Sequence, residues 1–208
     1  MHSKTSAQSF SIEKKLLDEN FLNLPNCLSF CRLLFLPVFI YFAKKYYLSN
    51  YNLKLYFLSL FFLSIIYLTD YLDGKLARLL HKETIFGKYL DPICDKFVAL
   101  TSFLLLVRFF GLPFWLLLFS LFREILGSYL GYYLFYKRGI QASPNLYGKW
   151  GVVLGVVIII YYLTLPVVSQ KFFLSQAKDM PCFVFVFLNL VGIFKYYKQY
   201  FKSARRGT

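Results

Sequence analysis

Residues 70–95 read DYLDGKLARLLHKETIFGKYLDPICD, and this stretch decides how the rest of the chain is interpreted. It holds four of the ten acidic residues of the chain, Asp70, Asp73, Asp91 and Asp95, with apolar sequence on both sides. A carboxylate at or near a lipid bilayer is costly, so its presence there indicates a function. Four carboxylates in so short a stretch require a cation.

The spacing of these residues places them on shared helix faces. Each residue of an α-helix advances by about 100°, and five residues of the first half fall within an arc of about 140°: Asp70, Asp73, Gly74, Ala77 and Arg78. In the second half, Gly87, Asp91 and Asp95 recur every four residues and stack on one face. Two such helices, joined by a short loop, would point four carboxylates into one space. Like charges that close cannot all stay ionised alone, and carboxylate ligands favour magnesium, manganese or calcium.

The composition indicates an integral membrane protein. The 208 residues are 58% hydrophobic and only 16% charged, and the mean hydropathy is +0.53. Apolar runs of about 18 residues or more recur along the chain, and such runs are long enough to cross a bilayer as helices. The net charge is +14, but the basic residues lie between apolar runs. This arrangement favours membrane topology and contact with anionic lipid or phosphate over nucleic-acid binding.

The sequence predicts an all-α membrane domain over residues 25–199, with six spans. The spans are expected at about 28–43, 53–74, 88–108, 114–136, 150–168 and 181–197. Pro92 is expected in the first turn of its helix, where its missing N–H costs nothing. Residues 1–24 are polar and then mildly amphipathic, which predicts an interfacial helix; a partly disordered tail is the alternative. Residues 200–208 are expected to form a basic cytoplasmic tail.

The distribution of basic residues predicts the orientation in the membrane. With six spans, both termini lie on the same side as the 70–95 stretch, and this side carries most of the 24 Lys and Arg residues. Loops on the cytoplasmic side are enriched in Lys and Arg. We therefore expect both termini and the aspartates at the cytoplasmic face, close to the ends of spans 2 and 3. The start of the chain also lacks the pattern of a cleaved signal peptide.

The aspartates form the pattern D-x2-D-G-x2-A-R-x8-G-x3-D-x3-D, which resembles the signature of the CDP-alcohol phosphatidyltransferase family. The resemblance implies transfer of a phosphatidyl group from CDP-diacylglycerol to an alcohol, with release of CMP. It implies Mg²⁺ or Mn²⁺ as cofactor, with two ions expected, and Asp70, Asp73 and Asp91 as metal ligands. Asp95 would be the general base and would also touch the second ion.

The same resemblance implies a nucleotide site beside the aspartates. Gly74 and Ala77 have almost no side chain, so the cytidine could approach the helix closely. Arg78 would contact the diphosphate, because a guanidinium group matches phosphate with two parallel hydrogen bonds. Gly87 would allow close packing of the third span. Asn26 opens the run PN-x-L-S-x2-R, which resembles the entry to the first span in bacterial members of the family.

The acceptor is expected to meet basic residues near the cytoplasmic face, and the candidates are Arg32, Arg123, Lys149 and Arg138. The runs R-E-I from Arg123 and A-S-x4-G-K-W ending at Trp150 resemble the phosphatidylglycerophosphate synthases of the family. Glycerol 3-phosphate is therefore the expected acceptor. These enzymes usually continue with Lys-Thr, whereas Gly151 and Val152 follow here, so serine, inositol phosphate and phosphatidylglycerol stay open.

Several alternatives follow from the residues themselves. Arg32 could snorkel to the membrane interface, and Arg123 with Glu124 could form a structural ion pair. Intramembrane carboxylates also occur in ion pathways, so a divalent-cation transporter is the distant alternative. The family resemblance further implies a homodimer surrounded by membrane lipid. A bacterial cytoplasmic membrane is the expected location.

Overall fold

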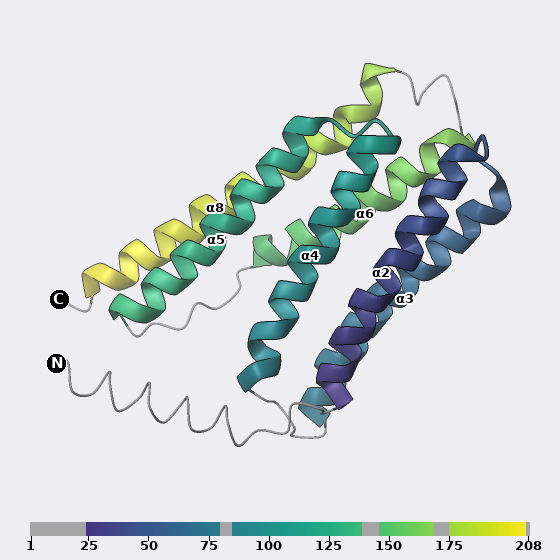
Figure 1. Ribbon diagram of the computed structural model, residues 1–208. Helices are drawn as coiled ribbons and strands as arrows, with labels where there is room; N and C mark the ends of the chain where they lie inside the picture. The colour runs from purple at the N-terminus through teal and green to yellow at the C-terminus, as the bar shows by residue number, and fades with distance from the viewer. Residues whose placement is uncertain (1–23, 80–84, 139–145, 169–174, 207–208) are drawn as a thin grey trace. The chain divides into compact units, whose positions relative to one another are not determined.

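The computed structural model describes residues 24–79, 85–138, 146–168 and 175–206 (Figure 1). Within these ranges the chain forms six long α-helices and one short 3-10 helix, and it forms no β-strand. The elements are α2 (Leu24–Leu48), α3 (Leu53–Leu79), α4 (Ile85–Phe109), α5 (Phe114–Arg138), α6 (Leu146–Val168), η1 (Gln176–Asp179) and α8 (Met180–Arg206). The predicted all-α class is confirmed.

Each predicted span overlaps one of these helices, but several boundaries differ. Helix α4 begins at Ile85, so Pro92 lies in the helix interior and not in the first turn, and that prediction was wrong. The helix extends further back because nothing in residues 85–90 stops it, and Pro92 then removes one backbone donor from the interior. Helix α8 continues through Arg206, so residues 200–206 are helical. The interfacial helix predicted for residues 1–24 lies outside the described residues, apart from Leu24.

Helix α4 ends where the sequence indicated a break. Gly111 has a φ of +68°, a left-handed conformation that glycine adopts without a steric cost. The Leu112 N–H donates back to the carbonyl of Leu106 over 3.2 Å, and Pro113 follows. The chain then enters α5 at Phe114. Gly111 and Pro113 therefore separate two helices, between the spans expected at 88–108 and 114–136.

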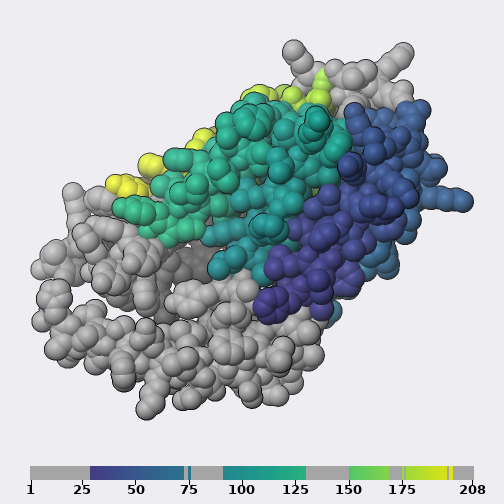
Figure 2. Space-filling model, viewed as in Figure 1, coloured from purple at the N-terminus to yellow at the C-terminus, as the bar shows by residue number. Residues whose placement is uncertain are grey.

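Among the described residues, three helices are long and apolar enough to cross a membrane, as expected of a membrane protein. The three segments are Leu53–Leu72, Trp150–Val168 and Ala177–Lys195. Large apolar side chains are exposed along α2, α3, α4, α5, α6 and α8, and Figure 2 shows one face of this surface, with α2 in purple. Exposed apolar area on this scale is costly in water and favourable in lipid. The total of six spans stays a prediction.

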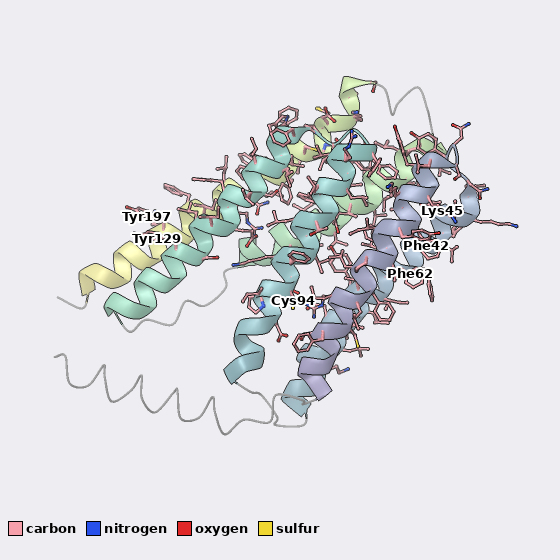
Figure 3. The ribbon with its side chains drawn as sticks, in the orientation of Figure 1. Phe42, Lys45, Phe62, Cys94, Tyr129 and Tyr197 are labelled. Carbon is pink, nitrogen blue, oxygen red and sulfur yellow. The ribbon has the colours of Figure 1, made fainter. Side chains whose placement is uncertain are left out.

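The described residues divide into two compact units, and the first contains most of α2 and α3 and the first half of α4. It comprises the residues up to Lys45 together with Phe57–Val98. Phe42 of α2 stacks on Phe62 of α3 with ring centroids 5.2 Å apart (Figure 3). Leu36, Phe39, Leu63 and Ile66 are buried. Phe62 also lies 6.3 Å from Phe35, so aromatic and aliphatic side chains together join the two helices.

The second unit comprises Tyr46–Tyr56 and the chain from Ala99 onward, and the packing of α6 on α8 is its main contact. Gly151 and Gly155 lie four residues apart on α6, and both face α8. A Cβ atom at Gly151 would meet Asn189, and one at Gly155 would meet Phe185. The partner residue moves back along α8 as the position on α6 advances, so the two helices are antiparallel. Small residues at this spacing allow helix backbones to approach closely in a membrane.

Tyr46 anchors the end of α2 within the second unit. Its side chain is fully buried, and its hydroxyl donates to the carbonyl oxygen of Leu163 over 3.2 Å. Its ring lies 5.5 to 5.7 Å from the rings of Tyr51, Tyr56 and Phe110. These contacts hold the short turn between α2 and α3, where Tyr51 has a φ of +66°. A bulky residue in that conformation is strained, so the surrounding rings stabilise it.

We expect Tyr46→Ala to destabilise the protein by about 3 kcal/mol, because it removes a buried ring and leaves a cavity. Tyr46→Phe keeps the ring and loses only one hydrogen bond, which costs about 1 kcal/mol. Tyr41→Ala on the same helix is the control, since 54% of the Tyr41 side chain is exposed. Thermal unfolding in detergent measures all three. An equal loss of stability in Tyr41→Ala and Tyr46→Ala would contradict the assignment of Tyr46 as an anchor.

Candidate active site

Arg32 lies at the centre of the predicted aspartate site. It is in α2 and is only 1% exposed, although it carries a permanent positive charge. Its Nη2 atom lies 2.9 Å from Oδ1 of Asp70 on α3, and its Nη1 atom donates to Oδ1 of Asp95 on α4. A buried guanidinium group is stable only with such partners. One side chain therefore connects three helices and brings two of the four motif carboxylates together.

Ser29 adds a second connection between the same helices. Its hydroxyl donates to Oδ1 of Asp91 over 2.5 Å. Ser29 and Arg32 are three residues apart on α2, and Asp91 and Asp95 are four residues apart on α4, so each pair shares a helix face. The two faces meet, and each residue of α2 contacts one carboxylate of α4. Cys94, labelled in Figure 3, marks this part of α4.

The carboxylates that Arg32 and Ser29 contact are also partly exposed. The side chain of Asp70 is 43% exposed and that of Asp95 is 50% exposed, in contrast to buried Arg32. Asp91 is half-buried. A substrate hydroxyl or a cation can therefore reach these carboxylates.

The donor set has the chemistry of a hard-cation site. Asp70, Asp91 and Asp95 supply only carboxylate oxygen atoms, which magnesium and manganese prefer. Within the described side chains, no group of three or more acidic, histidine or cysteine residues is assembled closely enough to hold a metal ion. The side chain of Asp73, the fourth member of the motif, lies outside that description. The residues thus fit a divalent cation by type, and the complete ligand set stays a prediction.

The other predicted contacts cannot be placed at side-chain level. Their backbones lie in helices, but their side chains are outside the described part of the structure. These residues are Asn26 in α2, Gly74, Ala77 and Arg78 in α3, Gly87 in α4, Arg138 at the end of α5, and Lys149 in the first turn of α6. Their roles in nucleotide and acceptor binding therefore stay predictions.

Arg123 belongs to a polar cluster of the second unit. Its Nη1 atom lies 2.9 Å from Oε1 of Glu124, the neighbouring residue in α5. The two residues thus form an ion pair, and the role of Arg123 in acceptor binding stays a prediction. The same guanidinium group reaches α6, because a Cβ atom at Gly151 would lie 3.4 Å from its Nη2 atom. Nη1 of Arg123 is therefore paired with Glu124, and Nη2 lies beside Gly151 of α6.

Sequence reasoning missed three residues of these clusters, Ser29, Gly151 and Asn189. Ser29 lies within the quoted run PN-x-L-S-x2-R, and its spacing from Arg32 was a usable signal. Asn189 is a single amide in the apolar part of α8. Its sequence context gave no signal of a role, and only its position beside Gly151 of α6 indicates one. Gly151 was noted as a departure from the expected Lys-Thr. The structure shows that the Asn189 side chain fills the space beside it.

The CDP-alcohol phosphatidyltransferase pattern matches residues 22–191, which cover most of the chain and include the whole aspartate motif. The chain belongs to this family. It is therefore an enzyme of the phosphatidyltransferase class, as the motif predicted.

Curated bacterial proteins show the same relationship. A Bacillus subtilis protein named CDP-diacylglycerol–glycerol-3-phosphate 3-phosphatidyltransferase is 29% identical over 66% of this chain and 70% of its own length. A Wigglesworthia glossinidia protein of the same name is 39% identical over 52% of this chain and 58% of its own length. A Mycobacterium tuberculosis protein with the provisional name cardiolipin synthase is 30% identical over 65% of this chain and 61% of its own length. The chain thus resembles family members with two different names.

The contacts of Arg32 predict an unusual stability pattern for this phosphatidyltransferase. Without its two carboxylate partners, the buried charge of Arg32 is uncompensated, so Asp70→Asn combined with Asp95→Asn should cost on the order of 3 kcal/mol. Adding Arg32→Met removes that charge and should recover at least half of the loss. Thermal unfolding with a chelator present measures this effect without bound metal.

Ser29→Ala serves as the comparison, because it removes one hydrogen bond and leaves all charges paired. We expect it to cost about 1 kcal/mol. A doubly substituted protein as stable as the wild type would show that Asp70 and Asp95 do not balance Arg32.

Proposed function

We propose that this phosphatidyltransferase transfers the phosphatidyl group of CDP-diacylglycerol to glycerol 3-phosphate and releases CMP. The observation that carries the proposal is the Arg32 cluster, which gathers carboxylates from α3 and α4 on one face of α2. Two of the relatives described above carry a name that states this reaction. The Arg123 cluster and the run ending in Trp150 add basic residues suited to an acceptor phosphate.

The proposed step is a substitution at phosphorus. The acceptor hydroxyl oxygen forms a bond to the phosphorus that carries diacylglycerol, and the bond from that phosphorus to the CMP oxygen breaks. The hydroxyl proton passes to Asp95, and CMP leaves with the electron pair of the broken bond. Asp95 suits the role of general base because its side chain is half exposed and its orientation is held by Arg32.

The remaining motif residues bind and orient the donor in this proposal. Asp70, Asp73, Asp91 and Asp95 would hold the Mg²⁺ or Mn²⁺ ions, whose charge offsets that of the diphosphate and of the leaving CMP. Arg78 would pair with the diphosphate, and Gly74 and Ala77 would leave room for the cytidine. Asn26 and Gly87 would complete the nucleotide side. Arg123, Lys149, Arg138 and Arg32 remain the candidates for the acceptor side.

Arg32 takes a different position in this proposal from the one that its sequence suggested. Its contacts to Asp70 and Asp95 make it an orienting group for the carboxylates, and they argue against free snorkelling to the interface. A phosphate contact by Arg32 would add to these ion pairs. We therefore rank Arg123 above Arg32 as the acceptor ligand.

The proposed location is a bacterial cytoplasmic membrane, crossed six times, with both termini and the aspartates on the cytoplasmic side. The bias of basic residues supports the orientation, and the three apolar helices support the membrane location. CDP-diacylglycerol would enter from the surrounding lipid, and glycerol 3-phosphate from the cytoplasm. A homodimer is part of the same proposal through the family resemblance.

Release of CMP from CDP-diacylglycerol by the purified protein tests the function. We expect release with Mg²⁺ or Mn²⁺ and glycerol 3-phosphate, and none after addition of a chelator. Serine, inositol, inositol phosphate and phosphatidylglycerol complete the panel, since one relative carries a different name. Release with one of these alone would keep the reaction and change the acceptor. No release with any acceptor, together with metal flux in liposomes, would favour the transporter alternative.

Asp95→Asn should reduce turnover at least a hundredfold, because an amide cannot accept the hydroxyl proton, and general-base removal costs about 10²–10⁴-fold. Binding of CDP-diacylglycerol should change little, since the amide oxygen can still accept the hydrogen bond from Arg32. Asp179→Asn is the matched control. Asp179 accepts a hydrogen bond from Tyr162 over 2.6 Å and lies outside the motif, so turnover should persist. Normal turnover in Asp95→Asn would remove Asp95 from the role of base.

A further inference from the structure

A buried amide in α8 has no role in the reaction as described so far. Asn189 lies within the apolar segment Ala177–Lys195 and is only 2% exposed. Its Nδ2 atom donates to the carbonyl oxygen of Phe185 over 2.7 Å, one turn earlier in the same helix. A polar side chain within a membrane helix is retained where it bonds to another helix or to a ligand.

The glycine at position 151 makes room for this amide. A Cβ atom on Gly151 would lie 2.4 Å from Oδ1 of Asn189, a separation that real Cβ atoms essentially never show. The same Cβ atom would lie 3.4 Å from Nη2 of Arg123. The amide oxygen of α8 and the guanidinium group of α5 therefore both lie beside one backbone position of α6. A side chain at position 151 would displace Asn189.

Gly155, one turn further along α6, gives a direct comparison. A Cβ atom there would lie 3.8 Å from the ring of Phe185 and 3.9 Å from that of Phe103, which are ordinary contact distances. Gly155 thus supports close helix packing but tolerates a methyl group. Gly151 does not, and the atoms that it accommodates are polar.

The two terminal nitrogen atoms of Arg123 have different surroundings. Nη1 of Arg123 pairs with Glu124, and Nη2 lies on the Gly151 side together with the Asn189 oxygen. A guanidinium group presents its donors in a rigid plane, so an acceptor oxygen beside one nitrogen sets the direction of the others. The side chain of Arg123 is 20% exposed, so a small ligand can reach it.

We propose that Asn189, whose side chain occupies the space beside Gly151, is a positioning residue that orients Arg123 for the phosphate group of the acceptor. The inference rests on the proposed function, because it takes Arg123 as an acceptor contact. The ligand class is a phosphomonoester, which glycerol 3-phosphate and inositol phosphate share. Asn189 lies beside Gly151 and does not contact the reacting atoms. We therefore expect it to affect acceptor binding and not the chemical step.

Four variants test the inference with glycerol 3-phosphate and CDP-diacylglycerol as substrates: Gly151→Ala, Asn189→Ala, the two combined, and Gly155→Ala as the control. Gly151→Ala and Asn189→Ala should each raise the KM for glycerol 3-phosphate about tenfold, the loss expected for a hydrogen bond to a charged group. The KM for CDP-diacylglycerol should stay within twofold, and Gly155→Ala should match the wild type. The combined variant should resemble Asn189→Ala alone, because the added methyl group no longer meets an amide.

A second readout keeps the inference testable if Asn189→Ala folds poorly. Inorganic phosphate should inhibit the wild type in competition with glycerol 3-phosphate, and its inhibition constant should rise in Gly151→Ala, which retains Asn189. Inositol phosphate, run as a second acceptor, should show the same rise in KM if the cluster recognises the shared phosphate group. A rise with glycerol 3-phosphate alone would overturn the assignment to a phosphomonoester class.

The failures of the two proposals are distinguishable. No turnover of glycerol 3-phosphate by the wild type refutes the proposed function. An active wild type with unchanged acceptor KM in Gly151→Ala and Asn189→Ala refutes the role of Asn189. Equal changes in both KM values together with a lower unfolding temperature would also refute it, because they would assign Asn189 to helix packing alone.

Discussion

The guanidinium group of Arg32 is buried against carboxylates of two other helices, and the first unit is built around this contact. A charge removed from water must be compensated by partners at short range. The group supplies donors in a fixed plane, so it determines both the separation and the direction of Asp70 and Asp95. Ser29 extends the same constraint to Asp91. Helix α2, which carries none of the motif, thereby orients the carboxylates of α3 and α4.

This arrangement explains how a chain with few charged residues can concentrate negative charge in a membrane protein. The carboxylates are partly exposed, whereas Arg32 is buried. The exposed carboxylates are suited by type to a cationic ligand. In a phosphatidyltransferase such a site offers carboxylates to a metal ion and one carboxylate to a proton, as the proposed reaction needs.

The second unit uses a different device to hold a charged side chain. Two glycines of α6 allow α8 to approach closely, and only one of them accommodates polar atoms. Asn189 of α8 and Arg123 of α5 both lie beside Gly151, which has no side chain. Close packing of helices in a membrane depends on such small residues, since apolar association alone favours lipid as much as protein. If the inferred role of Asn189 holds, one position serves both helix packing and acceptor recognition.

Much of this could be predicted from local sequence patterns. Long apolar runs determine where helices form in a membrane, because the backbone must satisfy its own hydrogen bonds there. The positions of all six long helices followed from that rule. The aspartate pattern indicated the CDP-alcohol phosphatidyltransferase family, and the match over residues 22–191 confirmed it. Helix ends were less predictable. Pro92 was placed in a first turn, whereas α4 begins at Ile85, because a proline alone does not determine where a helix starts.

The sequence by itself determined the all-α membrane class, the aspartate motif and the family, since each depends on residues close together in the chain. Only the tertiary structure decided which partners Arg32, Ser29, Gly151 and Asn189 have. Gly151 and Asn189 are 38 positions apart in the printed sequence, and Arg32 and Asp95 are 63 positions apart. Helix periodicity gives the face on which a residue lies. Packing between helices decides which face of a neighbouring helix that residue contacts. This packing depends on the side chains of both helices.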